Sequence, residues 1–422
     1  MRDLLKDILK VLARLTLARY APRVIAITGS VGKTSTKEAV AKVLGSKYSV
    51  RATAGNYNNE LGLPLTILNE ETGGRNGVLW LIVFIKSIFK LIFVNYPEVL
   101  VLELGTDRPG DIAYLVNLIG KVDIAILTDI GISHLEFFNP PQDLAKEKLS
   151  LIKKLPRTGA AILNFDNPLV LEGKNSTKAE VIGYGFNPQA NILISDLHVI
   201  DQHDLVGANF KIHHKGTVVP FFLPNALGKP AVYAAAAAAA SGLQLNVNLV
   251  AASEALKAYS QPPGRLRLIS GIKQTRIIDD TYNAAPDSTI AALEALSSIA
   301  HSRKLAAIGD MAELGPKSEA GHREIAAKIM ENQVDIVFLV GPKTKATADE
   351  LSKRQFMGKV YSFENSEEAK LPIQNELIEG DTILVKGSQS MRMEKIVLEI
   401  MADPEHARAL LVRQTAKWIK KP

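Results

Sequence analysis

An expected strand, a glycine-rich turn and an expected helix follow one another near the N-terminus, and this order limits the fold most strongly. The apolar run Val24–Ile27 predicts a β-strand, Thr28-Gly-Ser-Val-Gly-Lys-Thr34 predicts a tight turn, and Lys37–Leu44 predicts a helix. Such a turn gathers backbone N–H groups and the positive end of the helix dipole around one point. An anion is therefore expected at this turn, inside an α/β fold.

The side chains of the turn have the chemistry that phosphate binding needs. Gly29 and Gly32 let the backbone approach phosphate oxygens, and Lys33 can reach the terminal phosphates. The Thr34 hydroxyl can hold Mg²⁺. The longer phosphate-loop pattern has a glycine where this chain has Ile27, so the chain matches the shorter pattern Thr-Gly-x-x-Gly-Lys-Thr. We predict nucleoside triphosphate binding rather than a plain glycine turn before a helix.

The composition limits the partners and the compartment. A chain of 422 residues is long enough for two or three domains. Cysteine is absent, so any metal must use oxygen or nitrogen ligands. The net charge of +6 favours anionic partners such as nucleotides, and we expect no nucleic acid because no motif for it is present. Charged residues interrupt the first apolar run, so we expect no signal peptide and a cytoplasmic location.

Strand and helix patterns alternate through the first half of the chain, which predicts a mostly parallel sheet covered by helices. Further strands are predicted at Val99–Leu104, Ile124–Leu127 and Ala160–Asn164. Residues 181–223 have short strand patterns that predict an antiparallel extension. The run Ala231–Ala240 predicts a helix packed closely on the sheet.

A second α/β pattern follows the linker-like segment Gln261-Pro-Pro-Gly264. Its predicted strands are Arg276–Ile278, Lys304–Ile308, Ile336–Val340, Lys359–Tyr361 and Thr382–Val385. We therefore expect an N-terminal amphipathic helix (1–22), a central phosphate-loop ATPase domain (23–262) and a C-terminal Rossmann-like domain (263–422).

An apolar segment, Val78–Val94, interrupts the central domain as an insertion at 76–96. Only Lys86, Ser87 and Lys90 break it, and they predict a narrow polar stripe on a helix. At 1.5 Å per residue the helix would span roughly 25 Å, less than the ~30 Å of a bilayer core, so a transmembrane span is not expected. A core or dimer-interface helix and a membrane-surface helix both fit this pattern.

Polar residues at the ends of expected strands are candidates for catalysis. Glu103 ends the strand that precedes Gly105, and His134 follows the next strand after a short turn. Ligands of open parallel sheets bind at this edge, so both side chains are candidate metal ligands beside the phosphate loop. Lys148 lies on a helix shortly afterwards and would by itself be a surface lysine.

At this point the chain resembles a family, the Mur ligases, which form amide bonds with ATP in peptidoglycan synthesis. Seven segments in the family's order carry the resemblance: Ile27–Thr34, Asn56–Pro64, Glu103–Ile112, His134–Glu136, Asp279–Pro286, Gly309–Gly315 and Lys386–Ser388. The resemblance implies a central ATPase domain and a C-terminal domain that close over the substrates. It also implies D-alanyl-D-alanine addition to a muramoyl-tripeptide through an acyl phosphate.

The resemblance also implies roles for individual residues. It implies catalysis by Lys33, Glu103, His134 and Lys148. It implies ATP binding by Thr28, Gly29, Ser30, Gly32, Lys33, Thr34, Ser35, Arg265, Asp280 and Asn283. It implies substrate contacts by Asn58, Asn59, Tyr282, Lys386 and Ser388. Two Mg²⁺ ions are implied, held by Thr34, Glu103, His134 and Lys148, with Lys148 carbamylated; Lys146 is the alternative for that modification.

The chain departs from the family's pattern in four places, one of which is Asp129, where asparagine is usual. Only 23 residues precede Val24, so we expect that the usual N-terminal domain, which grips the uridine diphosphate, is missing. Ala231 and Ala234 stand near the positions where the family has asparagines that contact adenine, so purine contacts would depend on Asp280 and Asn283. Gln389 replaces the usual arginine and weakens anion recognition there.

Alternatives remain open for the function. A ligase of the same family acting on another carboxylate, such as a folylpolyglutamate-like or lipid-linked acceptor, would use the same residues. A nucleotide-binding scaffold that has lost catalysis belongs to a different class. We expect a monomer in the cytoplasm, with peripheral contact to the inner membrane surface possible through residues 78–94.

Overall fold

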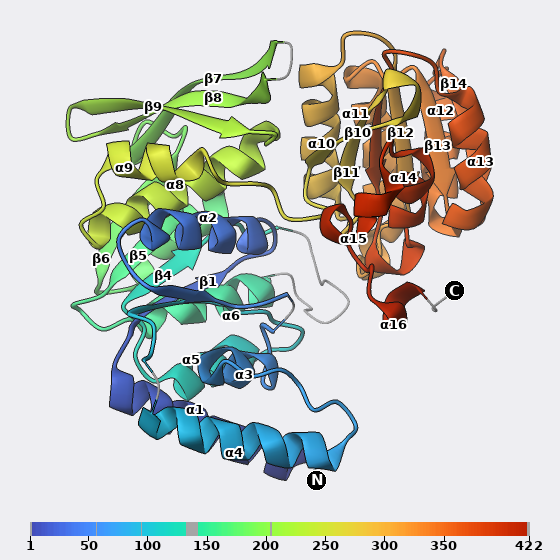
Figure 1. The fold of residues 1–422 in the computed structure, drawn as a ribbon. Helices are drawn as coiled ribbons and strands as arrows, with labels where there is room; N and C mark the ends of the chain where they lie inside the picture. The colour runs from blue at the N-terminus through green and yellow to red at the C-terminus, as the bar shows by residue number, and fades with distance from the viewer. Residues whose placement is uncertain (1, 56, 94, 132–141, 203–204, 420–422) are drawn as a thin grey trace.

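The computed structural model describes residues 2–55, 57–93, 95–131, 142–202 and 205–419, and their strands form two sheets (Figure 1). The first sheet has the order β2-β3-β1-β4-β5-β6-β7-β8-β9. Its strands are β1 (Arg23–Thr28), β2 (Val50–Ala52), β3 (Val99–Glu103), β4 (Ile124–Leu127), β5 (Ala160–Asn164), β6 (Glu180–Gly185), β7 (Ile192–Gln202), β8 (Leu205–His214) and β9 (Thr217–Pro224). Strands β2 to β7 pair in parallel and β7 to β9 antiparallel, so residues 192–224 form the expected antiparallel extension, whereas β6 belongs to the parallel part.

Helices cover both faces of the first sheet because its parallel strands are apolar on both sides. Helices α2 (Lys33–Gly45), α8 (Gly228–Gln244) and α9 (Leu249–Leu256) pack on one face. The other face is covered by α1 (Arg2–Tyr20), α3 (Gly62–Leu68), α5 (Asp111–Ile119), α6 (Gln142–Lys153) and α7 (Pro168–Glu172). The predicted α/β class is therefore confirmed.

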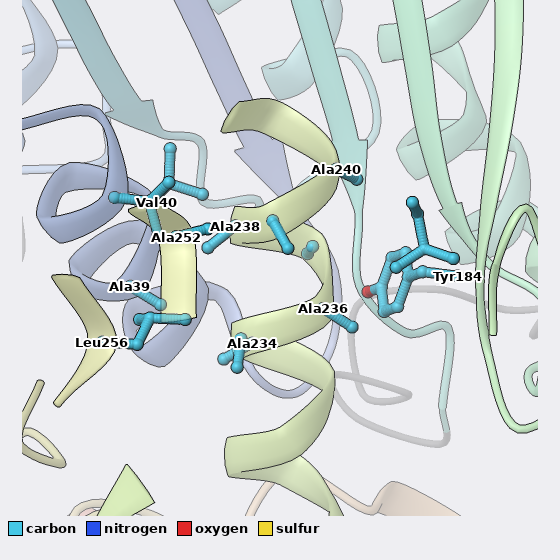
Figure 2. Close-up of a cluster of buried hydrophobic side chains, with 14 of the residues drawn as sticks. Ala39, Val40, Tyr184, Ala234, Ala236, Ala238, Ala240, Ala252 and Leu256 are labelled. Atoms are coloured by element: carbon cyan, nitrogen blue, oxygen red, sulfur yellow. The ribbon is translucent and has the colours of Figure 1, made fainter. Parts of the chain in front are cut away.

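The alanine run forms α8, as predicted, and it lies between other helices and the sheet (Figure 2). Val40 of α2 and Leu256 of α9 pack on one side of α8, and Tyr184 of β6 lies on the other. Alanine side chains are short, so all three layers approach closely, and every residue from Ala234 to Ala240 is buried. The helix has a structural role at the centre of this core.

The second sheet has the order β10-β11-β15-β12-β13-β14 and is parallel except for the β10·β11 pair. Its strands are β10 (Arg267–Ser270), β11 (Arg276–Asp280), β12 (Lys304–Gly309), β13 (Ile336–Val340), β14 (Lys359–Phe363) and β15 (Thr382–Lys386). The expected strands are all present, and the edge strand β10 is one that the sequence analysis missed. Its helices are α10 (Pro286–Ile299), α11 (Ser318–Glu331), α12 (Lys345–Lys353), α13 (Ser366–Glu376), α14 (Glu394–Ile400), α15 (Ala407–Leu410) and α16 (Ala416–Ile419).

The apolar segment forms α4 (Gly77–Phe93), which lies beside α1 beyond the helices of the first sheet (Figure 1). A core location is excluded, because several large apolar side chains of α4, such as Ile85 and Ile88, are exposed. Within the described ranges, none of the helices has the length and apolar character needed to cross a bilayer.

Candidate active site

The carboxyl ends of the two sheets face each other, and a cavity of about 360 Å³ lies between them. In the first sheet β1 lies between β3 and β4, and Ile27 pairs with Glu103 of β3, which brings the phosphate loop and that carboxylate together. In the second sheet Asp280 of β11 pairs with Lys386 of β15. The cavity is lined by Ser30, Lys33, Asn58, Asn59, Glu60, Glu103, Gly105, Thr106, Asp107, Asp111, Tyr114, Leu115, Lys148, Arg265, Tyr282, Asn283, Glu313 and Gln389.

The glycines of the loop have identifiable steric roles. Gly32 has φ +86° and precedes α2, a conformation that glycine adopts without the strain other residues incur. A Cβ on Gly29 would lie 2.0 Å from Thr128 Oγ1 and 3.0 Å from the backbone nitrogen of Asp129. The loop therefore lies directly against the end of β4, and neither glycine can be replaced without movement.

Lys33 points back over its own loop. Its Nζ donates to the carbonyl oxygens of Gly29 at 2.7 Å and Ser30 at 3.3 Å. Burial lowers the pKa of Lys33, and Glu103 partly offsets this effect. The ammonium group is thus held at the place where the loop would meet an anion.

Three further loop hydroxyls predicted to bind the nucleotide form hydrogen bonds within the protein. Thr28 Oγ1 donates to the carbonyl oxygen of Leu104 at 3.0 Å, and Ser35 Oγ donates to Oε1 of Gln261 at 3.3 Å. Ser30 Oγ accepts from the backbone nitrogen of Gly131 at 3.0 Å. The Thr28 and Ser35 side chains therefore fix the loop to its neighbours, including the segment that leads to the second sheet.

A line of polar groups runs from the loop to the end of β3. Thr34 Oγ1 donates to Glu103 Oε2 at 3.1 Å, and Asn58 Nδ2 donates to Glu103 Oε1 at 3.2 Å. Lys37 Nζ lies 3.9 Å from Glu103 Oε2 and gives this buried carboxylate a cationic neighbour. Adjacent hydroxyl and carboxylate oxygens are the donor set that Mg²⁺ prefers, so Thr34 and Glu103 fit this ion.

Lys148 and Lys146 lie on the same helix but differ in surroundings. The Lys148 side chain is 1% exposed, and its Nζ donates to the carbonyl oxygen of Gly29 at 2.9 Å. Burial and the charge of Lys33 set its pKa well below the usual value for lysine. The Lys146 side chain is 70% exposed and pairs with Asp143 at 2.9 Å. Only Lys148 therefore reaches the loop.

The predicted metal ligand His134 lies outside the described residues, as does the rest of the segment 132–141. In the part of the chain that the structure describes, no group of three or more His, Asp or Glu side chains is arranged to hold a metal ion. The carboxylate of Glu103 with the hydroxyl of Thr34 is the oxygen pair that lies at the loop.

Arg265 brings a positive charge to the cavity from the segment before β10. Its guanidinium lies over the ring of Tyr282, with 3.9 Å between the guanidinium carbon and the ring centroid. Its buried Nε has no hydrogen-bond partner among the described residues. A buried, unpaired donor is costly, and an anion in the cavity would satisfy it.

Lys386 has partners within the protein. Its Nζ lies 2.5 Å from Asp280 Oδ2 and 2.9 Å from the carbonyl oxygen of Asn283. Burial lowers the pKa of Lys386, and Asp280 opposes that shift. Ser388 Oγ accepts from the backbone nitrogen of Ala312 at 2.7 Å. Lys386 and Ser388 are not among the residues lining the 360 Å³ cavity.

Asn59, another predicted substrate residue, lines the cavity and also holds the start of α3. Its Oδ1 accepts from the backbone nitrogens of Leu61 at 3.2 Å and Gly62 at 3.0 Å. The 360 Å³ cavity therefore gathers Asn58, Asn59 and Tyr282, whereas Lys386 lines a smaller cavity beside Thr34 and Ser35 of the loop segment.

A second cavity, of about 190 Å³, borders the other side of the loop, and the sequence analysis missed it. Its lining includes Asp129, Asn164, Tyr184, Tyr233 and Asp287 with Gly32 and Thr36 of the loop. The buried hydroxyl of Tyr184 has no hydrogen-bond partner in the described chain. Burial and the nearby carboxylate of Asp287 raise the pKa of Asp129 to about 6. Residues from distant segments form this cavity, and the local signals for it were polar residues at strand ends, Asp129 after β4 and Asn164 at the end of β5.

Comparison with known proteins gives the chain its family. Residues 27–242 match the family model for the Mur ligase middle domain, and residues 264–389 match the model named Mur ligase, glutamate ligase domain. The UDP-N-acetylmuramoyl-tripeptide–D-alanyl-D-alanine ligase of Bacillus subtilis is 32% identical over 94% of this chain and 79% of that protein. The protein of the same name from Escherichia coli is 31% identical over 89% of this chain and 76% of that protein.

Solved structures give the same result. MurF from Acinetobacter baumannii has a TM-score of 0.77 and 26% identity, and the match covers 92% of this chain and 79% of that chain. MurF ligase from Thermotoga maritima in complex with ADP also has a TM-score of 0.77 and 26% identity, over 93% of this chain and 83% of that chain. Together with the two family models, these matches confirm the resemblance drawn from the sequence: the chain belongs to the Mur ligase family.

Proposed function

We propose that this protein is an ATP-dependent ligase that adds D-alanyl-D-alanine to a muramoyl-tripeptide precursor of peptidoglycan. The relatives that match at about 30% identity over most of the chain have names that state this activity. The observation that carries the proposal is the cavity between the two sheets. There, Lys33 and Arg265 bring cationic side chains beside the Thr34–Glu103 oxygen pair, and the buried Lys148 lines the same cavity. Such an arrangement can hold the phosphates of a nucleotide and the carboxylate of an acceptor next to each other.

ATP would bind along the loop, with its phosphates at Lys33 and Arg265. Three features support this placement: the glycines allow close backbone approach, Lys33 already lies over the loop, and the Nε of Arg265 lacks a partner in the described chain. The base would enter the 190 Å³ cavity, where Tyr233 and Asn164 offer an aromatic ring and an amide. Asp280 is paired with Lys386 and lines a smaller cavity together with Gly32 and Arg265, so it stays a proposed contact of the nucleotide.

Thr34 and Glu103 would hold one Mg²⁺, and His134 and Lys148 a second. Bound divalent cations offset the negative charge that accumulates on transferring phosphoryl groups. Glu103 is prepared for this role because Asn58 and Thr34 each fix one of its carboxylate oxygens. Second-sphere bonds of this kind orient a ligand.

We propose that Lys148, and not Lys146, is the carbamylated lysine. The support is its enclosure against the loop, whereas Lys146 faces solvent. The Lys148 ammonium group first loses a proton, and the neutral amine then joins CO₂ and releases a second proton, so the charge beside Gly29 changes from positive to negative. With ¹³C-labelled bicarbonate, a carbamate signal should appear in ¹³C NMR, remain in Lys146→Met and vanish in Lys148→Met. A signal that persists in Lys148→Met would contradict the assignment.

In the proposed reaction the acceptor's carboxyl group takes the terminal phosphoryl group of ATP, and the amine of D-alanyl-D-alanine then displaces phosphate. Lys33 and Arg265 would attract the carboxylate toward the phosphates. Tyr282, Asn283 and Gln389 line the cavity on the side of the second sheet and would contact the amine donor. Closure of the two parts would exclude water from the acyl phosphate.

We further propose that a single chain forms the working unit, because the phosphate-loop lysine Lys33, Glu103 and Arg265 meet in one cavity of that chain. The place of action would be the cytoplasm, where ATP is available.

The test is phosphate release from ATP, measured with and without D-alanyl-D-alanine and a muramoyl-tripeptide nucleotide. We expect turnover only when both are present, with formation of the pentapeptide product seen by mass spectrometry. Turnover that neither compound changes would refute the substrate assignment. ATP binding without turnover on any acceptor would favour the scaffold alternative.

A further inference from the structure

The helix α4 is oriented opposite to an ordinary surface helix, with its polar side toward the protein. Ser87 is buried, and its Oγ donates to the carbonyl oxygen of Val83 at 2.7 Å. Lys90 Nζ pairs with Glu70 at 2.6 Å and donates to the carbonyl oxygen of Asn69 at 2.7 Å. The polar stripe expected from the sequence is therefore largely satisfied inside the protein.

The opposite side of α4 exposes large apolar side chains along its length. Its exposed apolar residues, between 42% and 67% accessible, are Val78, Leu79, Leu81, Ile82, Ile85, Ile88, Phe89 and Ile92. Residues repeat every 100° around a helix, so these positions cover about half of its circumference. We call this set the α4 face. A helix of 17 residues makes this face roughly 25 Å long, and a contiguous exposed surface of this kind marks an interaction site.

The charge around the α4 face is positive. Helix α4 carries Lys86 and Lys90 and no acidic residue. Helix α1, which lies beside it, carries five basic residues and two acidic ones. The two helices together carry seven basic and two acidic residues, and of the basic ones Lys90 is paired with Glu70 and Lys6 with Glu60. Lys86 is exposed at the border of the apolar side, and Glu71 is an exposed acidic residue near it.

The two helices are also held together as one unit. Tyr20 Oη of α1 donates to the carbonyl oxygens of Lys90 at 2.9 Å and Leu91 at 3.1 Å in α4. Leu9 and Leu12 of α1 and Trp80 and Val83 of α4 share one apolar cluster. Figure 1 shows the pair beyond the first sheet, on the side away from β7, β8 and β9. A flat surface could therefore meet α4 and α1 together.

We propose that the α4 face docks the protein on an anionic lipid bilayer, with α4 lying in the plane of the membrane surface. The apolar side chains would enter the boundary between headgroups and acyl chains, and Lys86 would reach the lipid phosphates. The basic residues of α1 would add attraction to the anionic surface. A second copy of this chain would present the same positive charges again and repel, which favours the lipid. This inference is independent of the proposed ligase reaction.

The experiment uses the full chain and vesicles of phosphatidylglycerol and phosphatidylcholine, with vesicles of phosphatidylcholine alone for comparison. We expect the protein to float with the anionic vesicles. The double variant Leu81→Gln/Ile85→Gln should reduce the bound fraction by about tenfold or more, because two large apolar side chains no longer enter the lipid. Both positions are exposed, so the thermal midpoint and ATP turnover without lipid should stay at wild-type values.

A matched control makes the same chemical change elsewhere. Val250→Gln/Leu371→Gln removes two equally exposed apolar side chains from α9 and α13 and should leave flotation unchanged. Lys86→Gln should weaken binding to the anionic vesicles by about fivefold, the loss expected for one charge near the surface.

Three results would overturn the proposal. The first is a wild-type protein that does not bind the anionic vesicles. The second is equal binding by Leu81→Gln/Ile85→Gln and the wild type. The third is a wild-type dimer without vesicle binding that dissociates in Leu81→Gln/Ile85→Gln, since a second copy would then be the occupant. Absence of ligase activity would contradict the proposed function, but it would not change the conclusion about membrane docking, which depends on flotation alone.

Discussion

The buried pair of Asp280 and Lys386 allows a test of whether these residues stabilise the second sheet or contact the substrate. The two residues lie in register on neighbouring parallel strands, with Oδ2 and Nζ 2.5 Å apart. Both side chains are buried, and Asp280 Oδ1 also accepts from the backbone nitrogen of Leu266 at 3.2 Å. Removing either partner leaves an uncompensated charge in the interior, which costs roughly 3–5 kcal/mol of unfolding free energy.

We expect Asp280→Leu and Lys386→Met each to lower the thermal midpoint of the C-terminal part by roughly 6–20 °C, at about 2–4 °C per kcal/mol. The double variant Asp280→Leu/Lys386→Met should recover most of this loss, because an apolar pair of similar volume carries no desolvated charge. Lys370→Met serves as the control, since it removes a lysine whose partners lie at the surface and should cost at most about 1 kcal/mol. The assay is scanning calorimetry, which resolves the transitions of separate parts.

Activity of the same variants then separates the two roles of Lys386. If Lys386 serves only to neutralise the buried carboxylate of Asp280, activity should return together with stability in the double variant. If Lys386 itself binds the carboxylate of D-alanyl-D-alanine, as the family resemblance implies, KM for that substrate should stay high in the stable double variant. Single variants that differ from the wild type by less than about 1 kcal/mol would refute the reasoning about the buried pair.

Three further predictions concern the two cavities. Lys148→Met should lower turnover at least about 100-fold in a phosphate-release assay, since it removes a group beside the phosphates, whereas Lys146→Met should stay within about threefold. Tyr184→Phe should leave the thermal midpoint unchanged or higher, because it removes a buried hydroxyl without a partner in the described chain, and should raise KM for ATP if that hydroxyl contacts the base. Asp129→Asn should stabilise the protein by on the order of 1–3 kcal/mol at pH 7–8. The pKa of Asp129 in the folded protein, about 6, lies above the ordinary 3.8, so its ionised form at this pH favours the unfolded state, and asparagine carries no such charge. Below about pH 4, where Asp129 is protonated in both states, denaturant titrations should show no such difference; a gap that instead widens on acidification would contradict this account.

The sequence predicted the elements of the fold well where periodicity is strong. The alanine run, the apolar strands and the phosphate loop each have a local pattern that tertiary contacts reinforce, and all appear at the expected places. The short edge strand β10 was missed, because Arg267–Ser270 has little apolar pattern of its own. Backbone pairing with β11 stabilises this strand, which its own sequence does not predict.

Orientation was harder to predict than secondary structure. The spacing of Lys86, Ser87 and Lys90 indicated a polar stripe on α4, yet nothing local shows that this stripe turns toward Glu70. The same difficulty separates Lys146 from Lys148. They lie about 200° apart around α6, and only the packing of that helix decides which one reaches Gly29.

The cations of the site connect the two halves of the molecule through electrostatics. Lys33 belongs to the first part, and Arg265 comes from the segment that leads into the second sheet. Arg265 contributes to lowering the pKa of Lys33, so these two charges repel one another. A polyanion between them would replace this repulsion with attraction to both parts at once. Domain closure would then derive its driving force from the charge of the bound nucleotide, and a ligand with fewer phosphates should close the molecule less completely.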